Sequence, residues 1–124
     1  MKINPNLLYE SGSNTNGNYV KYADGTMICS GNKSGSINVT TSWGALYNSD
    51  NISFADFAQT FIETPIVTIT ANATTGGYLY IVASSPATNK TPSTTNPGGF
   101  CIMRNSSSNN VAYSVSYIAI GKWK

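Results

Sequence analysis

The chain has 124 residues, enough for one domain with one modest core, and its formal net charge is +2. Only 10% of the residues are charged, whereas Ser, Thr and Asn number 16, 14 and 15. These uncharged polar side chains favour strands, turns and caps over helices, and plentiful aromatic and β-branched residues exclude a disordered chain.

Charge and hydropathy exclude two further classes of protein. Lys and Arg form no cluster, so we expect no nucleic-acid partner. No apolar run approaches the roughly 20 residues of a membrane span, so we expect no membrane insertion. The first residues also lack the apolar core of a signal peptide, which favours release by cell lysis or a fragment of a longer chain.

The beginning of the chain divides into an arm and a hairpin. Residues 1–17 are rich in Asn, Ser and Gly without periodicity, so we predict a flexible N-terminal arm or linker there. Residues 18–124 then form the folded domain. Its first feature is Asp24-Gly25 between two runs rich in Tyr, Val, Thr and Ile, a pattern that predicts a hairpin with a type I′ turn.

The middle of the chain carries short β-patterns separated by turn signals. Residues 52–61 fit either helical turns or a strand that bends near Asp56, and we favour the strand because Pro65 follows closely. Residues 84–99 hold three prolines and predict a long surface loop. Further strands are expected at 36–41, 66–70, 78–83, 100–104 and 111–123. The pattern predicts an all-β fold, a small antiparallel β-sandwich of about six strands preceded by the hairpin.

The last predicted strand changes character along its length. Its alternate positions place one set of apolar side chains on one face: Val111, Tyr113, Val115 and Tyr117. The other face becomes apolar only at Ile118 and Ile120. We therefore expect this end of the strand to be covered on both sides, as by a neighbouring subunit.

Residue types argue against an enzyme. The chain has no His, which excludes Ser-His-Asp and Cys-His catalysis and most zinc or iron sites. Glycoside hydrolysis needs two facing carboxylates, and only Asp56 and Glu63 have no other evident role. No phosphate-binding loop or dinucleotide fingerprint is present. We expect no catalytic residues, no metal and no cofactor.

The two cysteines allow one disulfide by number alone. Cys29 and Cys101 each stand inside a β-pattern, where Cys commonly behaves as a small buried hydrophobe. We therefore favour two buried free thiols.

Binding chemistry is better represented. Sugar recognition combines directional hydrogen bonds with a flat aromatic face. Tyr78 and Tyr80 would share one face of a predicted strand, as would Tyr113 and Tyr117, and the single arginine, Arg104, has a planar fork suited to paired hydroxyls or a carboxylate. These five residues are the candidate ligand-binding set.

Each candidate also has a structural interpretation. Tyrosines at alternate strand positions commonly pack in a core or an interface, and a single arginine is commonly a surface charge. Trp43 and Trp123 are interpreted as packing anchors rather than sugar platforms.

Several motifs, in order, resemble one family. The segment GNYVKYADGTMICSG resembles the hairpin of many phage and prophage tail-fibre proteins of Gram-positive hosts, and residues 52–124 resemble the end domain of such fibres, which is similar to the H-type lectin domain. The matching pieces are Ile52-Ser53-Phe54, Phe61, Thr64-Pro65-Ile66-Val67, Gly99-Phe100 and the closing segment 115–124. The ending Ile-Ala-Ile-Gly-Lys-Trp-Lys is the most specific of these.

This resemblance implies a fold, an assembly and a role. It implies a six-stranded antiparallel sandwich that acts as a homotrimer in host adsorption, by binding a surface carbohydrate or protein. It implies a place on the virion, at the tail-fibre tip, or a prophage-encoded protein released by lysis. Sugar sites of the lectin family lie near contacts between protomers, and the resemblance assigns Arg104 and Tyr117 to such a site. The alternatives are a structural trimerisation cap, a free bacterial lectin-like protein and a polysaccharide hydrolase.

Overall fold

All regular secondary structure in the described part of the chain is β-strand. The computed structural model describes residues 7–74, 78–84 and 91–124. Its strands are β1 (Leu8–Asn14), β2 (Gly17–Tyr22), β3 (Thr26–Trp43), β4 (Leu46–Ser49), β5 (Ile52–Ser53), β6 (Ile66–Ala71), β7 (Ile81–Ser84), β8 (Gly99–Arg104) and β9 (Ser108–Lys122). The predicted all-β class is confirmed, and these ranges hold nine strands, compared with the expected sandwich of about six and its preceding hairpin.

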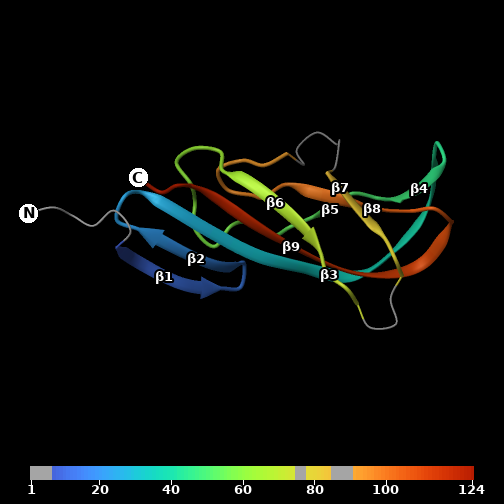
Figure 1. Ribbon diagram of the computed structural model, residues 1–124, viewed down its shortest axis with the longest axis horizontal. Helices are drawn as coiled ribbons and strands as arrows, with labels where there is room; N and C mark the ends of the chain where they lie inside the picture. Colours follow the sequence, from blue (N-terminus) through green and yellow to red (C-terminus); the bar gives the residue numbers. More distant parts are fainter. Residues whose placement is uncertain (1–6, 75–77, 85–90) are drawn as a thin grey trace, which may run out of the picture.

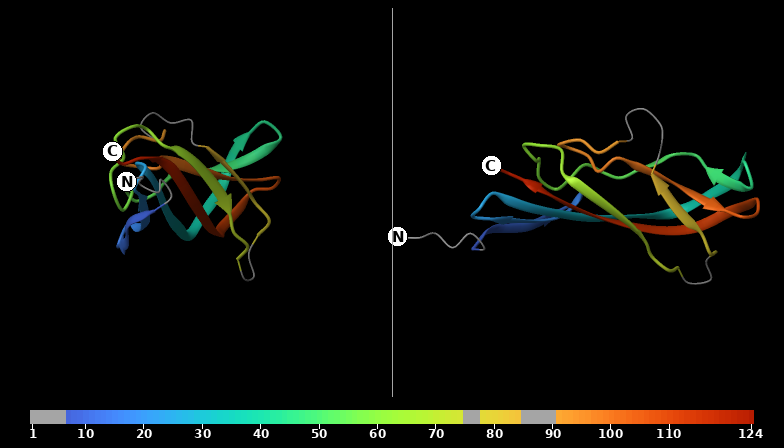
Figure 2. Two further views of the ribbon diagram at one scale, coloured as in Figure 1. Left: turned by 60° about the vertical axis from the view of Figure 1, so that its left-hand side comes forward. Right: turned by 45° about the horizontal axis from the view of Figure 1, so that its top comes forward.

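The long strand β3 organises one antiparallel sheet. It pairs with β2 and with β9, and the order β1-β2-β3-β9-β6 forms the larger part of the sheet. At its far end β3 pairs with β4, which leads into a smaller part where β8 pairs with β4, β5 and β7. The sheet curls so that the two parts enclose a core in a sandwich-like arrangement (Figures 1 and 2).

The molecule is elongated, and its two ends differ. Lys124 and the start of β3 lie at one end, while the β3–β4 and β8–β9 turns lie at the other (Figure 1). Thirteen residue pairs, from Thr26↔Lys122 to Val39↔Ser108, join β3 to β9 along this length, with one register shift. The two ends are therefore connected by a continuous β-ladder.

Aromatic side chains fill the core. Phe54, Phe57 and Phe61 come from the irregular segment between β5 and β6, and all are buried. The Phe54 ring lies 5.0 Å from the rings of both Phe100 and Tyr117, centroid to centroid. The expectation of a strand followed by a bend over residues 52–61 is confirmed, because this segment crosses the core without forming a helix.

Strand β9 alternates as its sequence predicts. One face is buried along its whole length: Val111, Tyr113, Val115, Tyr117 and Ala119. The opposite face carries Ile118 and Ile120, each about half exposed, and Ile120 pairs with Ile66 of β6, which is 78% exposed. In the single chain these three isoleucines form an open apolar surface, called here the isoleucine patch.

Glycine and tyrosine face each other across neighbouring strands. Tyr117 of β9 pairs with Gly31 of β3, and a Cβ at Gly31 would lie 2.7 Å from the tyrosine Cε1. The same pairing joins Tyr113 to Gly35 in the same ladder. The tyrosine rings therefore occupy the space that a side chain at Gly31 or Gly35 would need.

The hairpin is confirmed, but its turn type is not. A type I′ turn needs positive φ at both central residues, and Asp24 does not have one. Instead, Gly25 N donates to the Tyr22 carbonyl at 3.0 Å, and Gly25 alone has positive φ, at 98°. The Asp24 carboxylate accepts from Thr26 N at 2.8 Å, and this bond lowers the pKa of that carboxyl. A three-residue connection replaces the two-residue one.

The expectation of an unstructured arm over residues 1–17 is wrong for Leu8–Asn14. These residues form β1, which pairs with β2. Their polar sequence hides the strand because β1 is an edge strand with both faces exposed, so no apolar alternation marks it. Residues 1–6 lie outside the described part.

Two other expectations concern single residues. Cys29 and Cys101 are free and buried, as favoured, and burial raises the pKa of both thiols. Trp123 is a packing anchor, as interpreted. Its Nε1 donates to the Tyr22 carbonyl at 2.9 Å, and its ring lies 4.7 Å from that of Tyr9.

Candidate functional site

Arg104, the last residue of β8, stacks on an aromatic ring. Its guanidinium carbon lies 4.7 Å from the centre of the Tyr78 ring, within the range of a cation–π contact. Its Nε donates to the Leu79 carbonyl at 2.9 Å, and its Nη1 donates to the hydroxyls of Ser106 and Ser108. These hydrogen bonds hold the guanidinium over the Tyr78 ring.

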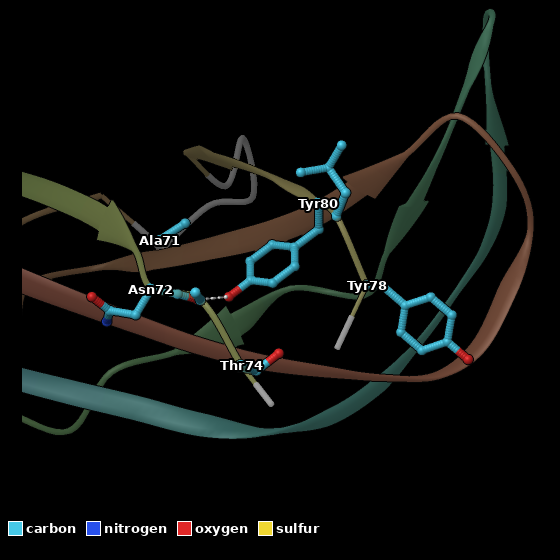
Figure 3. A pocket seen from close by; sticks show the side chains of 7 residues that line it. Ala71, Asn72, Thr74, Tyr78 and Tyr80 are labelled. Carbon is cyan, nitrogen blue, oxygen red and sulfur yellow. Dashed lines mark hydrogen bonds between the residues drawn. The ribbon is translucent and has the colours of Figure 1, made fainter. Parts of the chain in front are cut away.

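Tyr80 is fixed by hydrogen bonds to two other strands. Its hydroxyl lies 2.9 Å from the Asn72 carbonyl and 3.1 Å from the Ser114 carbonyl, and it accepts from Ser114 N at 3.0 Å. The ring points towards Asn72, whereas the Tyr78 ring points away from it (Figure 3). Tyr80 therefore links the segment before β7 to the residue that follows β6 and to β9.

Two adjoining cavities flank these side chains. The first is about 360 Å³ and is lined by Ala71, Asn72, Ala73, Thr74, Tyr78, Leu79 and Tyr80. The second is about 430 Å³ and is lined by Leu46, Leu79, Tyr80, Ile81, Met103, Arg104 and Asn105. Both cavities are lined by Leu79 and Tyr80, so they are treated as one continuous surface. We call this surface the Arg104 site.

The Arg104 site has the chemistry of a binding surface. Among the residues that line it, Arg104 is the single charged side chain, and none is a carboxylate. The tyrosine rings offer flat apolar faces, while Asn72, Asn105 and the guanidinium offer hydrogen-bonding groups. This arrangement can hold a hydroxylated ring or a carboxylate.

The structure brings together some predicted site residues and separates others. Arg104, Tyr78 and Tyr80 meet, but not on one strand face, because β7 begins only at Ile81. Tyr113 and Tyr117 lie in the core, so their placement among surface ligand-binding residues is wrong for the single chain. Tyr117 is 2% exposed, and burial raises its pKa to about 12.

Trp43 shows that the packing-anchor interpretation was wrong for one of the two tryptophans. It ends β3 beside the turn at Gly44 and is 62% exposed. A third cavity, of about 190 Å³, is lined by Trp43, Asn48, Ala83, Ser84, Cys101 and Met103. The available signal was the place of Trp43 beside Gly44, just after the predicted strand 36–41, because turns lie at the surface.

Two further features were sought in the described ranges: clusters of metal-binding side chains and membrane-spanning helices. Residues 7–74, 78–84 and 91–124 contain no group of three or more His, Cys, Asp or Glu side chains arranged to hold a metal ion. Asp56 accepts a hydrogen bond from the Asn96 amide at 2.9 Å, which gives this carboxylate a structural role. In the same ranges, no helix is long and apolar enough to cross a membrane.

Comparison with known proteins adds no identification. A scan against protein-family models and a search of the curated proteins both find no match for this chain.

Proposed function

We propose that the chain is the receptor-binding module of a phage tail-fibre tip, which attaches to a host cell-surface glycan through Arg104 and Tyr78. The observation that carries this proposal is the guanidinium stacked 4.7 Å over the Tyr78 ring between two open cavities. The resemblance of the closing segment 115–124 to tail-fibre end domains supplies the biological context. The protein is then located on the virion, or is encoded by a prophage and released by lysis.

The proposed contact follows from the chemistry of the side chains. A sugar ring presents an apolar C–H face and a rim of hydroxyls. The C–H face packs on tyrosine, while paired hydroxyls or a sugar carboxylate bond to the guanidinium fork. Leu79, which is 92% exposed, adds apolar area between the two cavities. Because Arg104 is already held by Leu79 and two serines, little side-chain freedom is lost on binding.

We propose a homotrimer as the active form. The isoleucine patch, formed by Ile66, Ile118 and Ile120, offers an apolar surface that a neighbouring protomer can bury. Three copies of a weak site on one particle increase avidity without any new contact. Light scattering checks this point, since the chain mass is 13.2 kDa and a particle of that mass would contradict the trimer.

The glycan proposal is tested by binding of the protein to a glycan array and to bacterial envelopes. Arg104→Gln should abolish retention, because it removes the only charge of the site and the planar fork. Lys33→Gln is the matched control: it also removes one positive charge, but Lys33 is an exposed residue of β3 outside the three cavities. Equal retention of both variants would count against the Arg104 site.

A structural trimerisation cap, with recognition elsewhere on the fibre, is the second candidate. The isoleucine patch is the observation that favours it, because an apolar surface needs a partner but not a sugar. Ile66→Asp together with Ile120→Asp should dissociate the trimer under either function. A trimer that is retained on no envelope and no glycan would favour the cap, whereas glycan binding by a monomer would favour a free lectin-like protein.

A further inference from the structure

Trp43 lies where an exposed tryptophan is unexpected. It stands at the β3–β4 turn, at the end of the molecule opposite Lys124 (Figure 1). Its side chain is 62% exposed, although Trp gains more than most residues from burial. The exposed indole therefore contributes little burial to the stability of the single chain and is open to contact with a ligand.

The surroundings of Trp43 provide both an apolar face and a polar partner. The indole borders a cavity of about 190 Å³ whose floor includes Cys101 and Met103, each 6% exposed. Asn48, which pairs with Met103 across β4 and β8, and Ser84 of β7 also line it. Within the described residues, neither of these two polar side chains forms a hydrogen bond. The register places Asn48 on the same face as Trp43 and Met103, so its amide is available to a ligand, whereas Ser84 pairs with the buried Phe100 on the other face of β7.

The charge of this cavity defines the class of its ligand. Each of its lining residues is uncharged, unlike the neighbouring Arg104 site. A flat aromatic face with one amide matches a neutral sugar ring, which needs C–H contact and directional hydrogen bonds but no counter-ion. A lipid tail would instead need an apolar groove without a polar side chain.

The cavity also adjoins the Arg104 site. Met103 lines both the Trp43 cavity and the second cavity of the Arg104 site, and Leu46 of that cavity pairs with Trp43 across β3 and β4. A chain of sugar units can therefore run over Met103 from one cavity to the other. Such a chain gains two contacts for one loss of translational freedom.

We propose that Trp43 and Asn48 form a second subsite, which takes a neutral sugar unit of the same glycan chain that Arg104 binds. This proposal rests on the function proposed above, because it assumes that the Arg104 site binds glycan. It assigns chain-length selectivity to Trp43: oligosaccharides long enough to cross Met103 bind more tightly than short ones. Trp43 is then a specificity-determining residue rather than a packing anchor.

The test uses the intrinsic fluorescence of the assembled protein. Trp43 and Trp123 are the two tryptophans of the chain, so a Trp123→Phe variant reports on Trp43 alone. The probes are short and long neutral oligosaccharides of glucose, galactose and N-acetylglucosamine, together with the glycans retained on the array. Long oligomers should change the Trp43 emission in a saturable way. Trp43→Ala should weaken their binding by about tenfold or more, with a smaller loss for short oligomers.

The controls separate the subsite from the function on which it rests. Trp43→Phe keeps an aromatic face and should retain part of the affinity, which a purely structural role would not predict. If Arg104→Gln abolishes binding while Trp43→Ala leaves the chain-length dependence unchanged, the subsite is refuted and the proposed function stands. If emission of the assembled protein shows a buried indole that no saccharide affects, another protomer covers Trp43 and the subsite is also refuted. Failure of every glycan to bind any form of the protein overturns both.

Discussion

Gly31 of β3 and Tyr117 of β9 lie directly opposite each other, and the tyrosine ring fills the space that a side chain at residue 31 would need. A Cβ built there lies 2.7 Å from Cε1 and 3.0 Å from the hydroxyl oxygen of Tyr117. The ring cannot swing aside freely, because it packs against Phe54 and Phe57 in the core. The glycine is therefore required by close approach and not by an unusual backbone angle.

Gly31→Ala should destabilise the fold by about 1–3 kcal/mol, because one extra methyl group forces Tyr117 against its aromatic neighbours. Urea unfolding followed by tyrosine or tryptophan fluorescence measures the change. Gly35→Ala is the graded control, since the nearest atom to its Cβ would be the Tyr113 hydroxyl oxygen, at 3.1 Å, with the ring carbons at 3.4 Å or more. A loss at Gly35 equal to or larger than that at Gly31 would contradict this explanation.

Stability should fall in alkaline solution because of Tyr117. The unfolded phenol has a pKa near 10.0, whereas burial raises the folded value to about 12. Between these values the unfolded chain releases a proton that the folded chain keeps, so rising pH favours unfolding. The contribution of Tyr117 to the free energy of unfolding is fully present below pH 10 and should fall by about 2–3 kcal/mol across this interval.

Tyr117→Phe should remove this part of the alkaline loss, whereas the part that comes from the buried thiols Cys29 and Cys101 remains. Within the described residues the buried Tyr117 hydroxyl has no hydrogen-bond partner, so its removal should leave stability at neutral pH unchanged or raise it by up to about 1 kcal/mol. Thermal unfolding across pH 8–12 compares the two proteins. A Phe variant that is markedly less stable at neutral pH would show that the hydroxyl has an essential partner.

Tyr80→Phe should be destabilising by about 1–3 kcal/mol, because the hydroxyl bonds to the backbone of both Asn72 and Ser114 and leaves those groups unpaired when it is lost. Differential scanning calorimetry measures the shift in Tm. Tyr78→Phe is the matched control, since the Tyr78 hydroxyl forms no hydrogen bond within the described residues and the ring stack on Arg104 remains. Equal Tm values for the two variants would contradict a stabilising role of the Tyr80 hydroxyl.

The two thiols should be protected in the native protein. Cys29 is fully buried and Cys101 is 6% exposed, and burial raises the pKa of each thiol, which keeps the reactive thiolate scarce. Titration with Ellman's reagent should detect almost no thiol in the folded state and both thiols in denaturant. A reductant should leave Tm unchanged, whereas a lowered Tm would indicate a disulfide.

The sequence predicts the closing strand well because its apolar residues repeat with the period of a half-buried strand. It does not reveal that β3 is a single strand of 18 residues. The stretch from Gly31 to Gly35 has no apolar side chains, so its strand character depends on tyrosines of β9 that are far away in sequence. Pairing across strands is nonlocal information, and local periodicity does not contain it.

The residues of the candidate site could likewise be predicted only in part from the sequence. Arg104, Tyr78 and Tyr80 could be named from their chemistry, and the structure brings them together. Tyr117 has the same chemistry but is buried, because strand alternation decides only which residues share a face and not which face is covered. Residue type alone predicts a packing role for Trp43, whereas its side chain is 62% exposed at the β3–β4 turn.

The continuous β3–β9 ladder also has a mechanical consequence. A pull applied at the Trp43 turn and resisted near Lys124 is directed along both strands, parallel to their axes. Their cross-strand hydrogen bonds are then loaded in shear and share the force, instead of opening one after another as in a zipper. A protein anchored at one end and attached to a cell at the other would resist tension along its long axis better than across it.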